Sequence, residues 1–124
     1  MKLSTARIFV RDLEAARAFY RDALGLKLRG GDPKLGYCVF DSGGAELVVE
    51  SVPDDAPADE KILVGRFTGL SFAVDDIAAI YERLRSRQVR FTGAPEPQAW
   101  GGILATFVDS AGNKLQLVQS PNAG

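Results

Sequence analysis

Residues 6–28 read ARIFVRDLEAARAFYRDALGLKL, and this stretch decides the fold. Apolar and polar residues alternate at its start, which predicts a strand over residues 3–10. Asp12 then caps a helix, because its carboxylate can accept hydrogen bonds from the free N–H groups of the first turn. Apolar residues follow at helical spacing, and Gly25 ends the helix in the position where a left-handed residue is preferred.

A weaker copy of this stretch returns at residues 70–91, which read LSFAVDDIAAIYERLRSRQVRF. Asp75 or Asp76 is predicted to cap the second helix, in the role that Asp12 has in the first. Gly44 and Gly112 are predicted to occupy equivalent turns of two later hairpins. The predicted strands are 3–10, 26–29, 35–41 and 45–51 in the first half, and 67–74, 89–92, 103–108 and 114–119 in the second.

Each half therefore has the element order βαβββ. We predict an α+β fold in which two βαβββ repeats form a cup-shaped mixed sheet, with the site between them. The chain is predicted to be a single domain, 1–124. Its repeat halves are 1–52 and 66–120, and an acidic, proline-bearing linker at 53–65 joins them.

The composition excludes several classes of function. A formal net charge of −1 gives no electrostatic reason to expect nucleic acid or an anionic membrane as a partner. No apolar run approaches the roughly 20 residues that a membrane-spanning helix needs, so we expect a cytoplasmic protein. Histidine is absent, which excludes Ser-His-Asp and Cys-His catalysis and zinc sites that need imidazole. The single cysteine, Cys38, lies in a predicted strand and is interpreted as a buried small hydrophobe.

Several motifs resemble the vicinal oxygen chelate superfamily, which includes glyoxalase I, extradiol dioxygenases, fosfomycin-resistance proteins and bleomycin-binding proteins. They are FVRDL at 9–13, AFYRDALGL at 18–26, FAVDDI at 72–77, WG at 100–101 and FVDSAGNKL at 107–115. The resemblance spans nearly the whole chain and implies the fold. It does not imply one activity, because functions diverge widely within the superfamily.

Enzymes of this superfamily hold a divalent metal with one ligand from each of four positions. Carried over by the resemblance, these positions are Thr5, Val48, Gly69 and Gln116. None is a carboxylate or an imidazole, which a divalent cation needs to offset its dehydration. A shift of two residues along the fourth strand would offer Glu46 or Glu50, but one carboxylate does not make a metal cage. We therefore predict no metal and no cofactor.

Strand alternation identifies the side chains that would face the predicted cup. Arg7 would need an anionic partner, either Glu46 or Glu50 within the chain or a ligand, and the partner within the chain is preferred. Trp100, in a loop rich in proline and glycine, is predicted to cover a ligand or a partner subunit, with a plain core position as the alternative. The predicted ligand-binding residues are Thr5, Arg7, Phe9, Tyr37, Glu46, Val48, Gly69, Ser71, Trp100 and Gln116.

One strand of this set carries only small residues on the cup face: Gly69, Ser71 and Ala73. Such a row indicates either close packing against a neighbouring strand or room for a ligand. The sequence leaves both alternatives open.

Three functions are compatible with these residues. The preferred one is a metal-independent protein that binds an aromatic or antibiotic-like small molecule without transforming it, as the bleomycin-resistance proteins of the superfamily do. The resemblance also implies a homodimer, with domain swapping as one arrangement. The alternatives are a metal-independent lyase or isomerase with Glu46, Glu50 or Tyr37 as base, and a scaffold subunit without a ligand.

Overall fold

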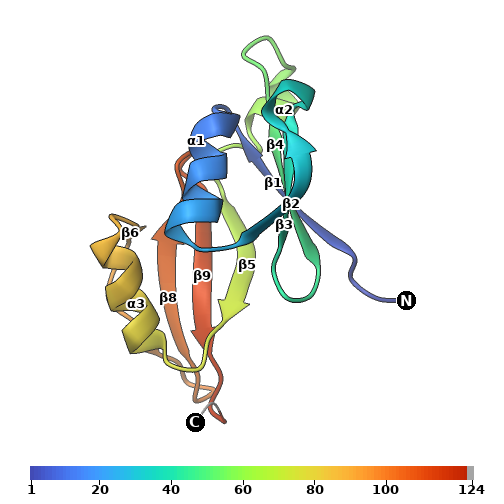
Figure 1. Ribbon diagram of the computed structural model, residues 1–124. Coiled ribbons are helices and arrows are strands. Elements are labelled where there is room, and N and C mark those ends of the chain that lie inside the picture. Colours follow the sequence, from blue (N-terminus) through green and yellow to red (C-terminus); the bar gives the residue numbers. More distant parts are fainter. Residues whose placement is uncertain (123–124) are drawn as a thin grey trace. The chain divides into compact units, whose positions relative to one another are not determined.

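The computed structural model describes residues 1–122, so the last two residues of the predicted domain lie outside the described part. The contacts divide the chain into two compact units. The first unit comprises Met1–Arg66 and the short segment Ser110–Asn113, and the second unit comprises the rest. The elements of both units are labelled in Figure 1.

The first unit is a four-stranded sheet with a helix on one face. The sheet has the order β1-β4-β3-β2, in which β1 and β4 are parallel and the other neighbours antiparallel. The elements in chain order are β1 (Thr5–Val10), α1 (Leu13–Ala18), the π-helical turn η1 (Phe19–Ala23), β2 (Lys27–Asp32), the 3-10 turn η2 (Pro33–Leu35), β3 (Tyr37–Asp41), β4 (Glu46–Ser51) and α2 (Ala58–Lys61).

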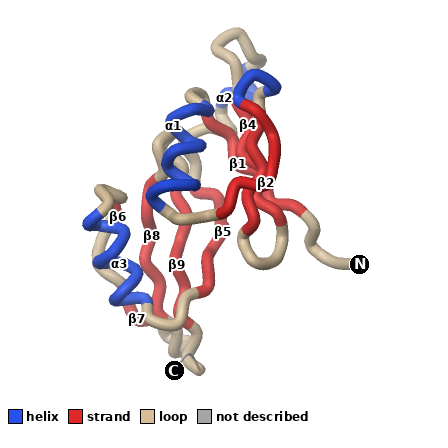
Figure 2. The backbone as a smooth tube through the Cα atoms, viewed as in Figure 1, coloured by secondary structure: helices blue, strands red, loops and turns tan. Residues whose placement is uncertain are grey.

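The second unit repeats this plan. Its sheet has the order β5-β9-β8-β6, with β7 paired to the far end of β8, and α3 lies along β8 and β9 (Figures 1 and 2). The elements are β5 (Phe67–Ala73), α3 (Ile77–Ser86), β6 (Arg90–Phe91), β7 (Glu96–Pro97), β8 (Ile103–Val108) and β9 (Lys114–Gln119).

The two sheets confirm the predicted α+β class and the βαβββ repeat. In both, the first strand of the repeat pairs in parallel with the last, and the middle strands follow in the same order. The helix caps are also equivalent: the carboxylate of Asp12 accepts from Ala15 N at 3.0 Å, and that of Asp76 accepts from Ala79 N at 3.1 Å. The cap of the second helix is therefore Asp76 rather than Asp75.

The structure differs from the predicted elements in several places, among them α2 within the predicted linker and β7 within a predicted loop. The helix after Asp12 widens into η1 before it ends, although Gly25 has the expected left-handed backbone with φ 78°. β2 continues through the predicted turn as far as Asp32, because a bulge between Leu28 and Gly30 keeps it paired with β3. Gly44 and Gly112 each lie two residues before the following strand, as predicted for equivalent turns, but in the first hairpin the left-handed φ of 86° is at Gly43.

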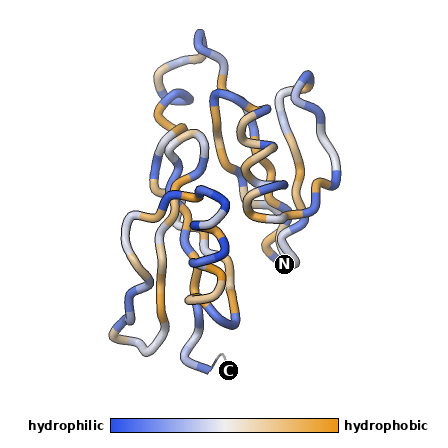
Figure 3. Tube along the Cα trace, turned by 60° about the vertical axis from the view of Figure 1, so that its left-hand side comes forward, coloured by the Kyte–Doolittle hydropathy of each residue, from blue (hydrophilic) through white to orange (hydrophobic). Residues whose placement is uncertain are grey.

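The core of each unit lies between its sheet and its helix. In the first unit, alternate residues of β1, β3 and β4 are buried, and Tyr20 meets Phe40 with ring centroids 5.9 Å apart. In the second, Phe107 of β8 packs near Phe91 and Phe72, with centroids 5.9 Å and 6.3 Å away. Figure 3 shows the resulting mixture of hydrophobic and hydrophilic positions along the strands and helices. One face of each sheet is thus left outside the core, as the alternation predicts.

Among the described residues, no helix combines the length and apolar character needed to cross a bilayer.

Candidate functional site

The open face of the first sheet carries an ion pair beside an aromatic ring. Arg7 of β1 donates through Nη2 to Glu50 Oε1 at 3.1 Å and through Nε to Glu50 Oε2 at 2.5 Å. The Arg7 guanidinium also lies 5.2 Å from the centre of the Phe9 ring. The Arg7 side chain remains 59% exposed. Arg7, Phe9 and Glu50 therefore form one cluster that is open to solvent.

The charged state of Arg7 is stabilised by this arrangement. Its pKa is raised above the ordinary arginine value, first by the hydrogen bonds to Glu50 and then by the negative charge of that carboxylate. The preferred partner within the chain is thereby observed, and it is Glu50 rather than Glu46. Arg7 pairs with Val48, so Glu46 and Glu50 lie two residues to either side of it on β4, and Phe9, whose ring the guanidinium also approaches, lies beside Glu50.

The other predicted residues of the first unit share this sheet. Val48 pairs with Arg7 across β1 and β4, and Tyr37 of β3 pairs with Glu50 on the other side of β4. Tyr37 is partly exposed at the start of its strand. The Cα register thus places Phe9, Glu50 and Tyr37 in one row across three strands.

The second sheet carries a row of hydroxyl and amide groups. The register places Ser71, Gln116 and Thr106 side by side on β5, β9 and β8. Gln116 donates through Nε2 to the Thr106 hydroxyl at 3.1 Å. Thr106 was not among the predicted site residues, although a hairpin centred on residue 111 places it opposite Gln116.

Gly69 explains part of the small-residue row on β5. Its backbone has φ 74°, a left-handed conformation, within the register shift between Phe67 and Ser71. No atom of the described residues lies within 4 Å of the position that a Cβ would take. Close packing therefore does not require this glycine, whereas its backbone conformation does.

A cavity of about 260 Å³ lies over the row of Gln116 and Thr106. Leu104, Thr106 and Gln116 contribute from the sheet, and the segment that runs from Thr92 to Gln98 supplies the wall. Of the residues around this cavity, only Gln116 belongs to the predicted ligand-binding set. Glu96 and Gln98 were missed because they lie in a segment rich in proline and glycine that shows no strand pattern.

Trp100 belongs to the turn that follows this wall. Its ring lies directly against the Cα of Gly102, in the space that a Cβ on Gly102 would need. The turn is held by hydrogen bonds from Gln98 N to Gly102 O at 2.8 Å and from Gly101 N to Gln98 O at 2.9 Å. Trp100 is nevertheless 55% exposed, so a plain core position is wrong.

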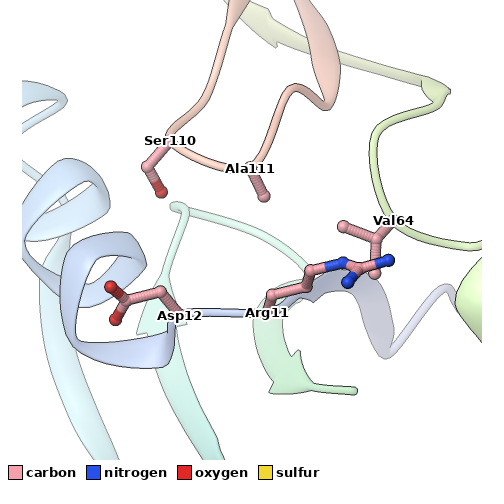
Figure 4. Close-up of a pocket in the computed structure, with 5 residues that line it drawn as sticks. All are labelled: Arg11, Asp12, Val64, Ser110 and Ala111. Carbon is pink, nitrogen blue, oxygen red and sulfur yellow. The ribbon is translucent and has the colours of Figure 1, made fainter. Parts of the chain in front are cut away.

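A second cavity, of about 350 Å³, lies in the first unit (Figure 4). The Arg11 side chain extends towards Val64, whereas the Asp12 carboxylate turns away from it, and Ser110 and Ala111 lie on the opposite side. Asp12 caps α1, and the Arg11 guanidinium is 3.7 Å from Asp54. Both charged groups thus have partners.

The residues at the family's four metal positions do not fit a divalent cation. Thr5 supplies a hydroxyl, Val48 supplies no atom that could bind a metal ion, and Gly69 has no side chain. The Gln116 amide is hydrogen-bonded to Thr106. Among the described residues, no group of three or more His, Cys, Asp or Glu side chains is gathered as a metal site would require. Glu50 would bring one carboxylate, and Arg7 already binds both of its oxygens.

Cys38 faces the core of the first unit and is 1% exposed. Burial raises the pKa of its thiol, and the nearby Arg17 charge only partly opposes this. The group is therefore held as a neutral thiol, which is a poor nucleophile.

Comparison with known proteins gives the family. The model of the Glyoxalase/Bleomycin resistance protein/Dioxygenase superfamily matches residues 2–117. YurT, an uncharacterized protein of Bacillus subtilis (strain 168), is 34% identical over 131 residues, covering 96% of this chain and 99% of YurT. A bleomycin resistance protein of Klebsiella pneumoniae is 27% identical, covering 94% and 91% of the two chains. A lactoylglutathione lyase of Salmonella typhimurium is 26% identical, covering 100% and 96%.

Solved structures give the same result. UcmS2 superposes with a TM-score of 0.81 at 28% identity, covering 97% of this chain and 98% of the other. TnmS3, an antibiotic binding protein from Streptomyces sp. CB03234, gives 0.72 at 28% identity, with 96% and 95% covered. A bleomycin resistance determinant encoded on the transposon Tn5 gives 0.69 at 27% identity, with 97% and 98% covered. The chain therefore belongs to the glyoxalase/bleomycin resistance protein/dioxygenase superfamily.

Proposed function

We propose that the protein is a metal-independent small-molecule-binding protein that sequesters an aromatic, antibiotic-like ligand without transforming it. The observation that carries this proposal is the chemistry at the four positions where metal-dependent relatives hold their ion. A hydroxyl, an aliphatic group, a glycine and a neutral amide cannot offset the dehydration of a divalent cation. The fold is retained while the means of Lewis-acid catalysis are not.

The open sheet faces support a binding role. The first sheet presents Phe9 and Tyr37 together with the Arg7–Glu50 pair, so planar apolar and charged groups stand side by side. Aromatic side chains bind planar ligands by stacking, and a few polar groups fix the orientation of the ligand. The second sheet adds the cavity over Gln116 and Thr106.

The relatives support the class of ligand. The Klebsiella pneumoniae relative is a bleomycin resistance protein, and TnmS3 is described as an antibiotic binding protein. Both are similar to this chain over more than nine-tenths of its length.

In the same proposal the protein acts in the cytoplasm as a homodimer, and each chain is one domain with repeat halves 1–52 and 66–120.

A second candidate is a metal-independent lyase or isomerase, because a lactoylglutathione lyase is also among the relatives. It would need a carboxylate or phenol base from Glu46, Glu50 or Tyr37. Glu50 is a poor choice, since Arg7 binds both of its oxygens. Glu46 lies beside Thr5 and is exposed, so its carboxylate is open to water.

The test begins with metal analysis of the purified protein. A stoichiometric, tightly bound divalent ion would overturn metal independence. Quenching of Trp100, the single tryptophan, by a panel of aromatic antibiotics then measures binding. Saturable quenching with no product by mass spectrometry supports sequestration, and a silent panel contradicts it. Turnover that is lost in Glu46→Gln or Glu50→Gln would establish the enzyme instead.

A further inference from the structure

The cavity of the second unit has an uneven distribution of hydrogen-bonding groups. Its polar side chains are Thr92, Glu96, Gln98, Thr106 and Gln116, and Leu104 is the large apolar residue in the lining. Glu96 is the one ionised side chain among the residues that line it, and no lysine or arginine does so. The cavity therefore carries a negative charge that its own lining does not compensate.

The two amides in the lining are already oriented by the protein. Gln98 donates through Nε2 to the backbone oxygen of Glu96 at 2.9 Å. Gln116 donates through Nε2 to the Thr106 hydroxyl at 3.1 Å. In each amide one N–H is engaged inside the protein, which fixes the plane of the group and the direction of its oxygen.

The acceptor atoms, by contrast, are not engaged. Within the part of the chain that the structure describes, neither the Gln98 nor the Gln116 side-chain oxygen accepts a hydrogen bond. The Glu96 carboxylate likewise has no arginine or lysine within 4.0 Å among these residues. Three acceptors of two kinds, one of them charged, thus line a single small cavity.

We propose that this cavity binds the cationic nitrogen group of the ligand, an ammonium or an amidinium, through Glu96, Gln98 and Gln116. A protonated nitrogen donor satisfies the amide oxygens and neutralises Glu96, and charge-assisted hydrogen bonds are the strong ones. A carboxylate or phosphate group is disfavoured there, because it meets the like charge of Glu96 and the two amide oxygens.

The volume of the cavity limits the size of the group that it can bind. At about 260 Å³ it lies just below the roughly 300–1,000 Å³ of pockets that hold a whole drug-sized ligand. It therefore receives one end of a ligand, and the rest of the ligand extends beyond it. This inference rests on the proposed binding function and adds to it the charge of the group that is bound.

The test uses three probes of one shape and different charge: benzamidinium, benzamide and benzoate. Binding to the full chain is followed by ¹H–¹⁵N correlation spectra, in which the side-chain amides of Gln98 and Gln116 report the site. We expect benzamidinium to bind at least about tenfold more tightly than benzamide, and benzoate not to bind.

The variants assign the preference to Glu96. Glu96→Gln keeps the shape of the side chain and should weaken benzamidinium about tenfold while it leaves benzamide unchanged. Gln98→Glu adds a second carboxylate and should tighten benzamidinium. Glu60→Gln on α2, in the first unit, is the matched control and should change neither.

Several results would overturn the inference: no shift of the two amides with benzamidinium, binding of benzoate, or unchanged benzamidinium affinity in Glu96→Gln. The antibiotic panel separates this failure from failure of the proposed function. If aromatic antibiotics bind the wild type and Glu96→Gln equally, sequestration stands and the cationic preference is wrong. If benzamidinium binds as expected and the panel is silent, the cavity stands and aromatic sequestration is wrong.

Discussion

Asn113 donates through its side-chain Nδ2 to the backbone oxygen of Phe9, 2.8 Å away and 104 positions earlier in the chain. Its side-chain oxygen accepts from Gly65 N at 2.8 Å and from Arg66 N at 3.2 Å. Asn113 is fully buried, so one amide satisfies backbone groups from two distant segments of the first unit. Water cannot replace these bonds without entering the core.

Replacing this amide should be costly. Asn113→Ala leaves buried backbone groups without partners, each worth roughly 1–3 kcal/mol, so we expect a loss of about 2–4 kcal/mol in unfolding free energy. Urea denaturation measures it. Asn122→Ala, an exposed site, is the matched control and should stay within about 0.5 kcal/mol of the wild type. Equal effects of the two substitutions would contradict the assigned role.

Substitution of Gly69 should lower stability because of its backbone conformation rather than because of contacts with neighbouring atoms. A side chain in the left-handed region costs roughly 1–2 kcal/mol, so Gly69→Ala should lower the unfolding free energy by about that amount. Gly93→Ala is the control, since that position also has open space around it but an ordinary φ. If Gly69→Ala leaves the unfolding free energy unchanged in the same denaturation experiment, the strand does not need the left-handed residue.

Gly102 should control the position of the Trp100 ring. A Cβ at Gly102 occupies the space of the indole, so Gly102→Ala should displace the ring and shift its emission maximum to longer wavelength. Overpacking of this kind typically costs about 1–3 kcal/mol. Gly44→Ala adds the same methyl where nothing lies within 4 Å and should leave the emission unchanged. The cost should also fall when the ring is removed first, in the pair Trp100→Ala and Trp100→Ala/Gly102→Ala.

Asp41 should make stability depend on pH in the acid range. Its pKa is lowered first by the hydrogen bond from Gly43 N at 2.9 Å and then by the charge of Arg29, while partial desolvation opposes them. A lowered pKa in the folded state stabilises the fold above the pKa of the unfolded chain, and this contribution disappears as pH falls through the folded value.

Asp41→Asn should therefore be less stable than the wild type at pH 7, and the difference should close under acid conditions. Denaturant melts at a series of pH values measure this. Asp55→Asn, an exposed residue of the linker, serves as the control and should differ little from the wild type throughout. A difference that persists at low pH would mean that the charge of Asp41 is not its cause.

Much of the architecture could be predicted because it depends on local chemistry. Alternation in β1 separates Ile8 and Val10, which are buried, from Arg7, and the caps Asp12 and Asp76 locate α1 and α3. The resemblance to the superfamily is likewise confirmed. What could not be predicted depends on register or on backbone conformation. The bulge that extends β2 and the left-handed Gly69 follow from pairing that a single sequence does not display. The choice of Glu50 over Glu46 follows from side-chain conformation, which the sequence does not display either.

The residues of the candidate site could likewise be predicted only in part. The residues on the open faces followed from strand alternation, and their role in binding stays a prediction. Glu96 and Gln98 could not be identified, because a two-residue strand in a proline-rich segment has no periodicity to recognise. Thr106 could have been found, since the predicted hairpin already placed it opposite Gln116.

The membership of residues 110–113 in the first unit bears on how the chain folds during its synthesis. The N-terminal segment of a nascent protein leaves the ribosome first and often folds before the rest is made. Here the backbone groups of Phe9 and Gly65 must wait for Asn113 to emerge, 104 residues after Phe9. Such long-range closure slows folding, so the nascent first unit should stay open to chaperones and proteases until residues 110–113 have emerged.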